Sequence, residues 1–309
     1  MARIVITEFM DTPAVARLRE AGHDVLYDPA LVDDAARLLT EASRAEALVV
    51  RNRTQVRGDL LAALGRCTVV GRLGVGLDNI DEPGCAARRI RVVPATGANA
   101  LSVAEYVLAL VMVLLRGAYA ASAEVAAGRW PRPALSNGRE THGKTLGLVG
   151  FGAIGRLTAR LGRGLGMTVI ACDPMLRADD PAFAEHGVRR ADLDALLAAC
   201  DAVSLHLPLT DATRGLFDAT RLASMKTGAV LVNTARGGIV DEAALAAALR
   251  SGRLGGAALD VFSEEPLPPT AHFDGCPNLI LTPHIAGVTT ESNARVSVLI
   301  ADRILETLA

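Results

Sequence analysis

The feature that most constrains this fold is a glycine-rich loop between a short apolar run and a helical pattern. The run Thr145–Val149 leads directly into the loop Gly150–Gly155, which reads GFGAIG and matches G-x-G-x-x-G. Glycines at this spacing allow a tight turn, a close approach of backbone to a phosphate, and close packing of helix on strand. The order strand, loop, helix predicts a βαβ unit and a parallel sheet covered by helices.

Short apolar runs alternate with helical patterns along nearly the whole chain, which is typical of parallel strands joined by helical crossovers. The first group of predicted strands is Ile4–Thr7, Asp24–Tyr27, Ala47–Val50, Thr68–Gly71 and Arg91–Val93. The second group is Thr145–Val149, Thr168–Cys172, Ala202–His206, Ala229–Asn233, Gly256–Val261 and Leu279–Thr282. A chain of 309 residues has room for two domains. We therefore predict an α/β protein with two doubly wound parallel sheets.

A long apolar helix is expected between the two groups. Ser102 and Glu105 match an S-x-x-E capping box, and Gly117 is a plausible end of the helix. Its body is apolar nearly all round, which predicts burial between domains or subunits. The following segment Gly128–Lys144 is rich in proline and glycine and is expected to be an exposed arm or linker.

Composition argues against several classes of function. The formal net charge is −2 without a long basic run, so neither a nucleic acid nor a membrane surface is an expected partner. The most apolar stretch, Val107–Leu115, is far shorter than the ~20 residues of a membrane span. No cluster has metal-ligand spacing, so no metal is expected. Scattered cysteines, odd in number, predict reduced thiols and a cytoplasmic protein: Cys67, Cys85, Cys172, Cys200 and Cys276.

An acid at the end of the second strand of the glycine-loop domain predicts which dinucleotide is bound. Asp173 lies 18 residues after Gly155, where a carboxylate can bind both ribose hydroxyls and repel a 2′-phosphate. This position favours NAD over NADP, although the nearby Arg177 leaves the second possibility open.

Three polar residues follow directly after predicted strands of the same domain: Arg236, Glu265 and His284. Ligands of parallel sheets bind beyond the carboxyl ends of the strands, so these three side chains can face one crevice. Histidine suits removal of a hydroxyl proton during hydride transfer, and a neighbouring carboxylate would favour its protonated form. Arginine offers a planar fork to a substrate carboxylate. Together they predict the oxidation of a 2-hydroxy acid.

Several segments resemble the D-isomer-specific 2-hydroxyacid dehydrogenase family, most closely its phosphoglycerate dehydrogenases and their short relatives. They are LVGFGAIG (Leu148–Gly155), VNTARGGIVDE (Val232–Glu242), ALDVFSEEP (Ala258–Pro266) and TPHIAG (Thr282–Gly287). GRLGVGLDNID (Gly71–Asp81) and ANALSVAEY (Ala98–Tyr106) also match, so the resemblance covers nearly the whole chain.

The resemblance implies a discontinuous, flavodoxin-like substrate domain of residues 1–97 and 285–309, and a Rossmann NAD-binding domain of residues 98–284. It implies that His284 is the general acid/base, Glu265 its partner, and Arg236 the ligand of the substrate carboxylate, which backbone around Leu73, Gly74, Val75 and Gly76 also holds. It further implies a homodimer formed through the cofactor domain. The expected cofactor-binding residues are Gly150, Gly152, Ala153, Ile154, Gly155, Asp173, His206, Pro208, Thr234, Ala235, Arg236, Asp260, His284 and Gly287.

The substrate itself stays open between several acids. Arg51 and Asn52 follow the strand Ala47–Val50, and Arg72 follows the next strand, so extra cations favour a substrate with a second anionic group. A 3-phosphoglycerate-like acid and sulfolactate both satisfy this charge, and hydroxypyruvate or glyoxylate is also possible. Formate oxidation is disfavoured because such enzymes pair the histidine with glutamine rather than a residue like Glu265. A dinucleotide-sensing binding protein without activity is the remaining alternative.

Overall fold

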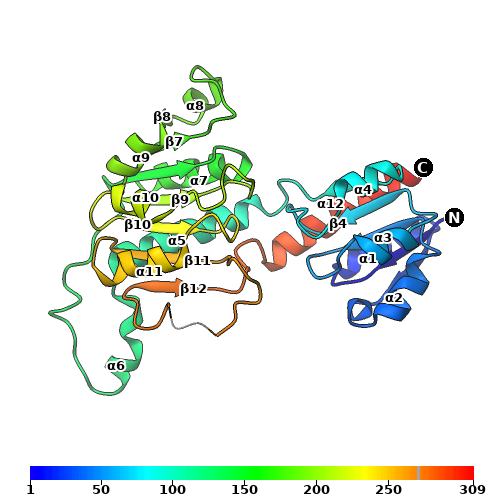
Figure 1. Ribbon diagram of the computed structural model, residues 1–309, viewed down its shortest axis with the longest axis horizontal. Helices are drawn as coiled ribbons and strands as arrows, with labels where there is room; N and C mark the ends of the chain where they lie inside the picture. Colours follow the sequence, from blue (N-terminus) through cyan, green and yellow to red (C-terminus); the bar gives the residue numbers. More distant parts are fainter. Residues whose placement is uncertain (270–271) are drawn as a thin grey trace. The chain divides into compact units, whose positions relative to one another are not determined.

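The computed structural model describes residues 1–269 and 272–309, and the chain divides into two compact units. Unit 1 comprises Met1–Asn99 together with Val288–Ala309, and unit 2 comprises Ala100–Gly287. Both ends of the chain therefore contribute to unit 1, as the colours of Figure 1 show.

Unit 1 contains a five-stranded parallel sheet in the order β2-β1-β3-β4-β5. This is the order of flavodoxin-like doubly wound sheets, in agreement with the predicted fold class. The strand order reverses at β1, which pairs in parallel with β2 on one side and with β3 on the other. The strands are β1 (Arg3–Ile6), β2 (Asp24–Tyr27), β3 (Ala47–Val50), β4 (Val69–Arg72) and β5 (Arg91–Pro94).

Helices cover both faces of this sheet because side chains alternate along its buried strands. Ile4 and Ile6 pack with Ile300 of the last helix, whereas Val5, between them, belongs to a second core cluster with Leu60. The helices are α1 (Thr12–Glu20), α2 (Ala35–Ala42), α3 (Gly58–Ala63), α4 (Glu82–Ala87) and α12 (Thr290–Leu308), with a 3-10 turn at Leu31–Asp33.

Unit 2 contains a seven-stranded sheet in the order β12-β11-β10-β9-β6-β7-β8, again with parallel pairing throughout. Six of these strands have the Rossmann order 3-2-1-4-5-6, and β12 extends the sheet at one edge. The strands are β6 (Thr145–Val149), β7 (Thr168–Cys172), β8 (Arg189–Arg190), β9 (Ala202–Leu205), β10 (Val230–Asn233), β11 (Gly256–Leu259) and β12 (Leu279–Leu281).

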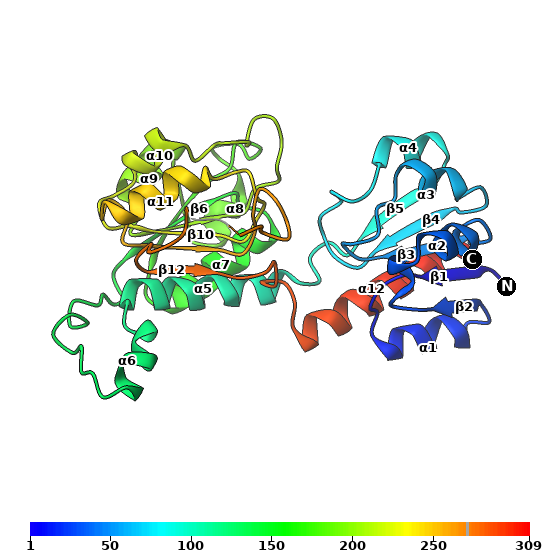
Figure 2. The same ribbon diagram turned by 60° about the horizontal axis from the view of Figure 1, so that its bottom comes forward.

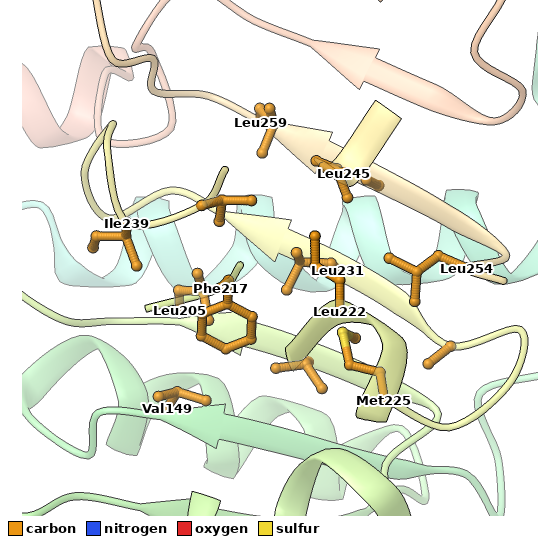
Figure 3. Packing of buried hydrophobic residues seen from close by; sticks show 14 of the residues in the cluster. Val149, Leu205, Phe217, Leu222, Met225, Leu231, Ile239, Leu245, Leu254 and Leu259 are labelled. Atoms are coloured by element: carbon orange, nitrogen blue, oxygen red, sulfur yellow. The ribbon is translucent and has the colours of Figure 1, made fainter. Parts of the chain in front are cut away.

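Two layers of helices enclose the sheet of unit 2, with α5 and α7 on one face and α9, α10 and α11 on the other (Figure 2). Leucine, valine, isoleucine, methionine and phenylalanine side chains fill the second of these layers against β6, β9, β10 and β11 (Figure 3). The helices are α5 (Ala100–Arg116), α6 (Ser122–Ala126), α7 (Ala153–Gly164), α8 (Pro181–Glu185), α9 (Leu193–Ala199), α10 (Ala219–Ser224) and α11 (Glu242–Arg250), with a 3-10 turn at Tyr119–Ala121.

Two local details differ from the sequence-based expectations. The capping box is wrong, since α5 begins at Ala100 and Ser102 is buried inside its first turn. The edge strand β8 was not predicted, because its exposed Arg189 and Arg190 form no apolar run. Within the described residues no single helix is long and apolar enough to cross a membrane; α5 meets that test only jointly with Tyr119–Ala126, across a 75° bend.

Candidate active site

The glycine loop of unit 2 has the geometry that a bound pyrophosphate requires. Gly150 has a φ of +99°, and a Cβ there would lie 2.4 Å from the carbonyl oxygen of His206. A Cβ on Gly155 would lie 2.5 Å from the Gly150 oxygen, so helix and strand approach too closely for any side chain. Gly152, by contrast, borders open space at the N-terminus of the twelve-residue helix α7. That arrangement leaves backbone N–H groups and a helix dipole for phosphate oxygens.

Asp173 lies at the end of β7, where the ribose of a dinucleotide is expected. Its carboxylate accepts hydrogen bonds from the backbone N–H groups of Phe151, at 2.8 Å, and Met175, at 2.9 Å. The carboxylate therefore anchors the glycine loop and keeps lone pairs for hydroxyl groups. Arg177, the residue that left NADP as an alternative cofactor, is highly exposed and pairs with Asp179 at 3.1 Å.

Two buried polar atoms at the ends of adjacent strands lack a partner in the described part of the chain. They are Nε2 of His206, after β9, and Oγ1 of Thr234, after β10. Burial lowers the pKa of His206 to about 4, so its ring is neutral near pH 7. Since buried polar groups are normally satisfied, these atoms fit a ligand that supplies donors and acceptors, as a dinucleotide would. The structure places Pro208, Ala235 and Gly287 in the loops at the same end of unit 2.

His284 and Glu265 form a direct pair, as the sequence predicted. Nδ1 of His284 lies 2.7 Å from Oε2 of Glu265, and half of the His284 side-chain surface is exposed. The other Glu265 oxygen accepts a hydrogen bond from the backbone N–H of Phe262 at 2.9 Å. Burial by itself raises the pKa of Glu265, but the hydrogen bonds from His284 and Phe262 and the positive charge of Arg236 bring it below its ordinary value. The carboxylate is thus ionised beside the imidazole.

Arg236 is held in the loop after β10 by a buried amide. The side chain of Asn233 accepts from the backbone N–H of Ala235 at 3.0 Å and donates to the Arg236 carbonyl at 2.9 Å. The Arg236 guanidinium donates to the Ala235 carbonyl at 2.6 Å and interacts electrostatically with Glu265. The structure therefore brings all three predicted catalytic residues to the same end of the unit 2 sheet.

Gly237 explains how the Arg236 loop and the Glu265 loop come so close. A Cβ on Gly237 would lie 1.7 Å from the carbonyl oxygen of Phe262, which no side chain can tolerate. Glu242 also binds the Glu265 loop, because its carboxylate accepts a hydrogen bond from the backbone N–H of Ser263 at 2.7 Å. Gly237 and Glu242 have no role predicted from the sequence, although both lie within the motif VNTARGGIVDE.

Asp260, which the family resemblance placed at the cofactor, is bound to the loop that carries His284. The side chain is 1% exposed. Its oxygens accept from Oγ1 of Thr282 at 2.6 Å, the N–H of Ile285 at 2.9 Å and the N–H of Ala286 at 2.8 Å. These donors flank His284, which has a φ of +55°. The Asp260 carboxylate thus shapes the loop that carries His284.

The predicted substrate-binding residues outside this group lie in unit 1. Arg51 and Asn52 follow β3, and Arg72 ends β4 with its guanidinium donating to the Leu73 carbonyl at 3.3 Å. The Arg72 head group lies directly over Gly74, where a Cβ would meet Nη1 at 1.3 Å. Leu73 is buried, while Val75 is partly exposed and Gly76 follows it in the same loop.

Within the described residues, no group of three or more His, Cys, Asp or Glu side chains could hold a metal ion.

Comparison with known proteins identifies the family. Residues 108–286 match the model of the D-isomer specific 2-hydroxyacid dehydrogenase NAD-binding domain. The chain is 55% identical to an (S)-sulfolactate dehydrogenase of Chromohalobacter salexigens over 100% of this chain and 99% of that protein. It is 36% identical to a D-3-phosphoglycerate dehydrogenase of Archaeoglobus fulgidus over 98% of this chain but only 56% of that protein.

A solved structure has the same fold. The TT0316 protein from Thermus thermophilus superposes with a TM-score of 0.89 at 34% identity, over 99% of this chain and 96% of that one. The glycine loop, the Glu265–His284 pair and these likenesses agree on one class of chemistry. The chain belongs to the D-isomer specific 2-hydroxyacid dehydrogenase family and is an NAD-dependent oxidoreductase of 2-hydroxy acids.

Proposed function

We propose that the substrate is sulfolactate, oxidised reversibly to sulfopyruvate. The observation that carries this proposal is the 55% identity to an (S)-sulfolactate dehydrogenase along the full length of both chains. The charge of the substrate agrees with it, because sulfolactate has a sulfonate in addition to its carboxylate. The chain offers arginines for both groups: Arg236 is the proposed ligand of the carboxylate, and Arg51 and Arg72 are the candidates for the sulfonate.

The proton of the substrate hydroxyl is taken by His284. Because Nδ1 is bound to Glu265, Nε2 is the nitrogen that receives this proton during oxidation and returns it during reduction. Glu265, ionised through its lowered pKa, stabilises the imidazolium that forms and fixes the orientation of the ring. When bound, NAD accepts the hydride that leaves C2 of the substrate. The glycine loop and Asp173 would hold the NAD.

The substrate carboxylate is bound by the guanidinium of Arg236, whose planar fork matches two carboxylate oxygens. Its donors also polarise the adjacent C2 oxygen as this oxygen changes from hydroxyl to carbonyl. Asn233 and Gly237 keep the Arg236 loop close to the Glu265 loop. The proposed carboxylate ligand thus lies near the proposed acid/base pair of His284 and Glu265.

A panel of 2-oxo acids tests the substrate. NADH oxidation is followed at 340 nm with sulfopyruvate, phosphohydroxypyruvate, hydroxypyruvate and glyoxylate. We expect the highest kcat/KM with sulfopyruvate. A higher value with phosphohydroxypyruvate would refute the proposal and favour 3-phosphoglycerate, for which the 36% identity to a D-3-phosphoglycerate dehydrogenase is the supporting observation.

Replacement of His284 tests the mechanism independently of substrate identity. His284→Ala removes the proton acceptor, so kcat is expected to fall by about 100-fold or more while NADH still binds. NADH binding is measured by its fluorescence. Turnover at the wild-type rate would remove His284 from the acid/base role, and loss of NADH binding would point to a damaged cofactor domain instead.

A homodimer formed through unit 2 is part of the proposal. Apolar side chains of α5 and the following segment are exposed, among them Met112, Tyr119 and Trp130, the last with 73% exposure. Exposed apolar side chains are often buried by association with a second copy. Light scattering with Trp130→Ser as the variant tests this expectation, since a monomeric wild-type chain would refute it.

We also propose a cytoplasmic location. All five cysteines are free thiols in the structure, and burial raises the pKa of Cys67 to about 11 and that of Cys200 to about 12. Such thiols are stable in a reducing compartment that also holds NAD. Cell fractionation with activity measured in each fraction provides the test.

A further inference from the structure

Arg51 lies at the position in unit 1 where doubly wound sheets bind ligands. The strand order reverses between β1 and β3, and Arg51 is the residue directly after β3. In doubly wound sheets ligands bind beyond the carboxyl ends of the two strands between which the order reverses. The corresponding loop after β1 contains Glu8 and Phe9.

Glu8 fixes the backbone of the loop that carries Arg51. The side chain is only 4% exposed, and its carboxylate accepts from the N–H groups of Arg51 at 2.9 Å, Arg53 at 3.1 Å and Thr54 at 2.9 Å. Burial raises the pKa of Glu8, but these hydrogen bonds more than offset it and the pKa is lowered. On the other side, the Asn79 amide donates to the Arg51 and Thr54 carbonyls at 3.2 and 2.7 Å. Hydrogen bonds from Glu8 and Asn79 therefore hold this loop on two sides.

The Arg51 side chain is held by two neutral groups. Its Nη2 donates to Oδ1 of Asn293, on α12, at 2.8 Å, and its Cζ lies 5.7 Å from the centre of the Phe9 ring. In the described part of the chain no carboxylate forms an ion pair with the Arg51 guanidinium, although the Glu8 carboxylate interacts electrostatically with it. By contrast Arg53, in the same loop, pairs with Asp33, and Arg3, Arg17 and Arg37 of the same unit also bind carboxylates.

This difference matters because an amide fixes a guanidinium without cancelling its charge. An aspartate at position 293 could make the same hydrogen bond but would form an ion pair with Arg51. A half-buried guanidinium is also poorly hydrated, so an incoming anion displaces little water from it. A loop held by hydrogen bonds, an aromatic face and a neutral acceptor together hold the Arg51 guanidinium in place to bind a ligand anion.

We propose that Asn293 and Phe9 are specificity-determining positioning residues, which hold Arg51 for the second anionic group of the substrate. The inference rests on the proposed function, since it takes Arg51 as the ligand of that group. Sulfonate, which carries a single negative charge, is the chemical class expected. Neither Asn293 nor Phe9 contacts the reacting atoms; both act through Arg51.

The test compares Asn293→Asp with Asn293→Gln, Phe9→Leu and the matched control Arg53→Gln. The assay measures KM and kcat for sulfopyruvate and for glyoxylate, which has a single anionic group. Asn293→Asp should raise the KM for sulfopyruvate about 10- to 100-fold, the range of one hydrogen bond to a charged group, with kcat little changed. The KM for glyoxylate should change far less. Asn293→Gln should retain much of the wild-type affinity, Phe9→Leu should weaken it several-fold, and Arg53→Gln should match the wild type.

The outcomes separate this inference from the proposed function. Wild-type preference for sulfopyruvate over glyoxylate tests the proposed function, whereas loss of that preference in Asn293→Asp tests the inference. An equal rise of both KM values in Asn293→Asp would mean a structural role and overturn the inference. An unchanged KM for sulfopyruvate would overturn it as well, and glyoxylate turnover shows that each variant is folded.

Discussion

Asp260 offers the sharpest test of how the fold positions the catalytic histidine. Its buried carboxylate accepts three hydrogen bonds from Thr282, Ile285 and Ala286, on both sides of His284. Asp260→Ala removes all three acceptors and leaves the backbone of the loop free to move. Asp260→Asn keeps one oxygen but places an NH₂ group where a carboxylate oxygen accepted a backbone N–H.

The expected cost follows from these contacts. Each hydrogen bond to a charged group is worth roughly 1.5–3 kcal/mol, so three of them set an upper limit well above the typical cost of a single substitution. Removal of the buried charge also removes its desolvation cost, and a relaxed loop can bind water. We therefore expect Asp260→Ala to lower the free energy of unfolding by about 3–5 kcal/mol, and Asp260→Asn by about 1–2 kcal/mol. A displacement of His284 by about 1 Å should lower kcat about 100-fold.

The assay combines urea unfolding, NADH binding and turnover. The matched control is Asp201→Ala, since the Asp201 carboxylate is also buried in unit 2 and accepts from Thr145 N–H at 2.9 Å and Lys226 Nζ at 2.8 Å. It should lose stability while kcat stays near the wild-type value. If Asp260→Ala loses stability like the control but keeps kcat, the positioning role is wrong. If only its NADH affinity falls, Asp260 is a cofactor ligand, as the family resemblance implied.

Three further predictions concern residues at the same end of the unit 2 sheet. Gly237→Ala forces a Cβ against the Phe262 carbonyl, so both Tm and kcat should fall, and a crystal structure should show a displaced Glu265 loop. The pKa of Glu265 is lower in the folded chain than in an unfolded one, so its contribution to stability is present above the unfolded pKa and lost as pH falls through the folded pKa. In urea unfolding, the difference in free energy of unfolding between wild type and Glu265→Gln should therefore shrink as pH falls, and a constant difference would contradict the lowered pKa. Asp173→Ala should weaken NADH binding and improve the ratio of NADPH to NADH turnover, which an unchanged ratio would refute.

The alternation of strands and helices and the three residues after strands could be predicted because each depends on local order in the chain. Glu265 and His284 follow β11 and β12, and the carboxyl ends of parallel strands all lie at the same end of the sheet. The contacts of Asp260 could not be found in this way. The family resemblance placed Asp260 at the cofactor, but the sequence holds no sign that its oxygens accept from backbone N–H groups of another loop.

Glu8 shows the same limit from the other side. It is an acid directly after the first strand, the pattern that singled out Arg236 and His284, but it is buried beneath a loop rather than facing a ligand. Its exposure depends on how the loop after β3 folds over it. A pattern of residue types after strands indicates which end of a sheet carries polar groups, not which of them point outward.

Periodicity and glycine spacing in the chain by themselves determined the two α/β domains, the dinucleotide loop and the end of the sheet at which the catalytic groups lie, because these depend on neighbours a few residues apart. Only the tertiary structure decided which polar group satisfies which. Arg51 meets Asn293 across 242 positions, and Asp260 meets its loop across 25. Hydrogen-bond partners of buried groups are set by the segments that packing brings together, and no local pattern records them.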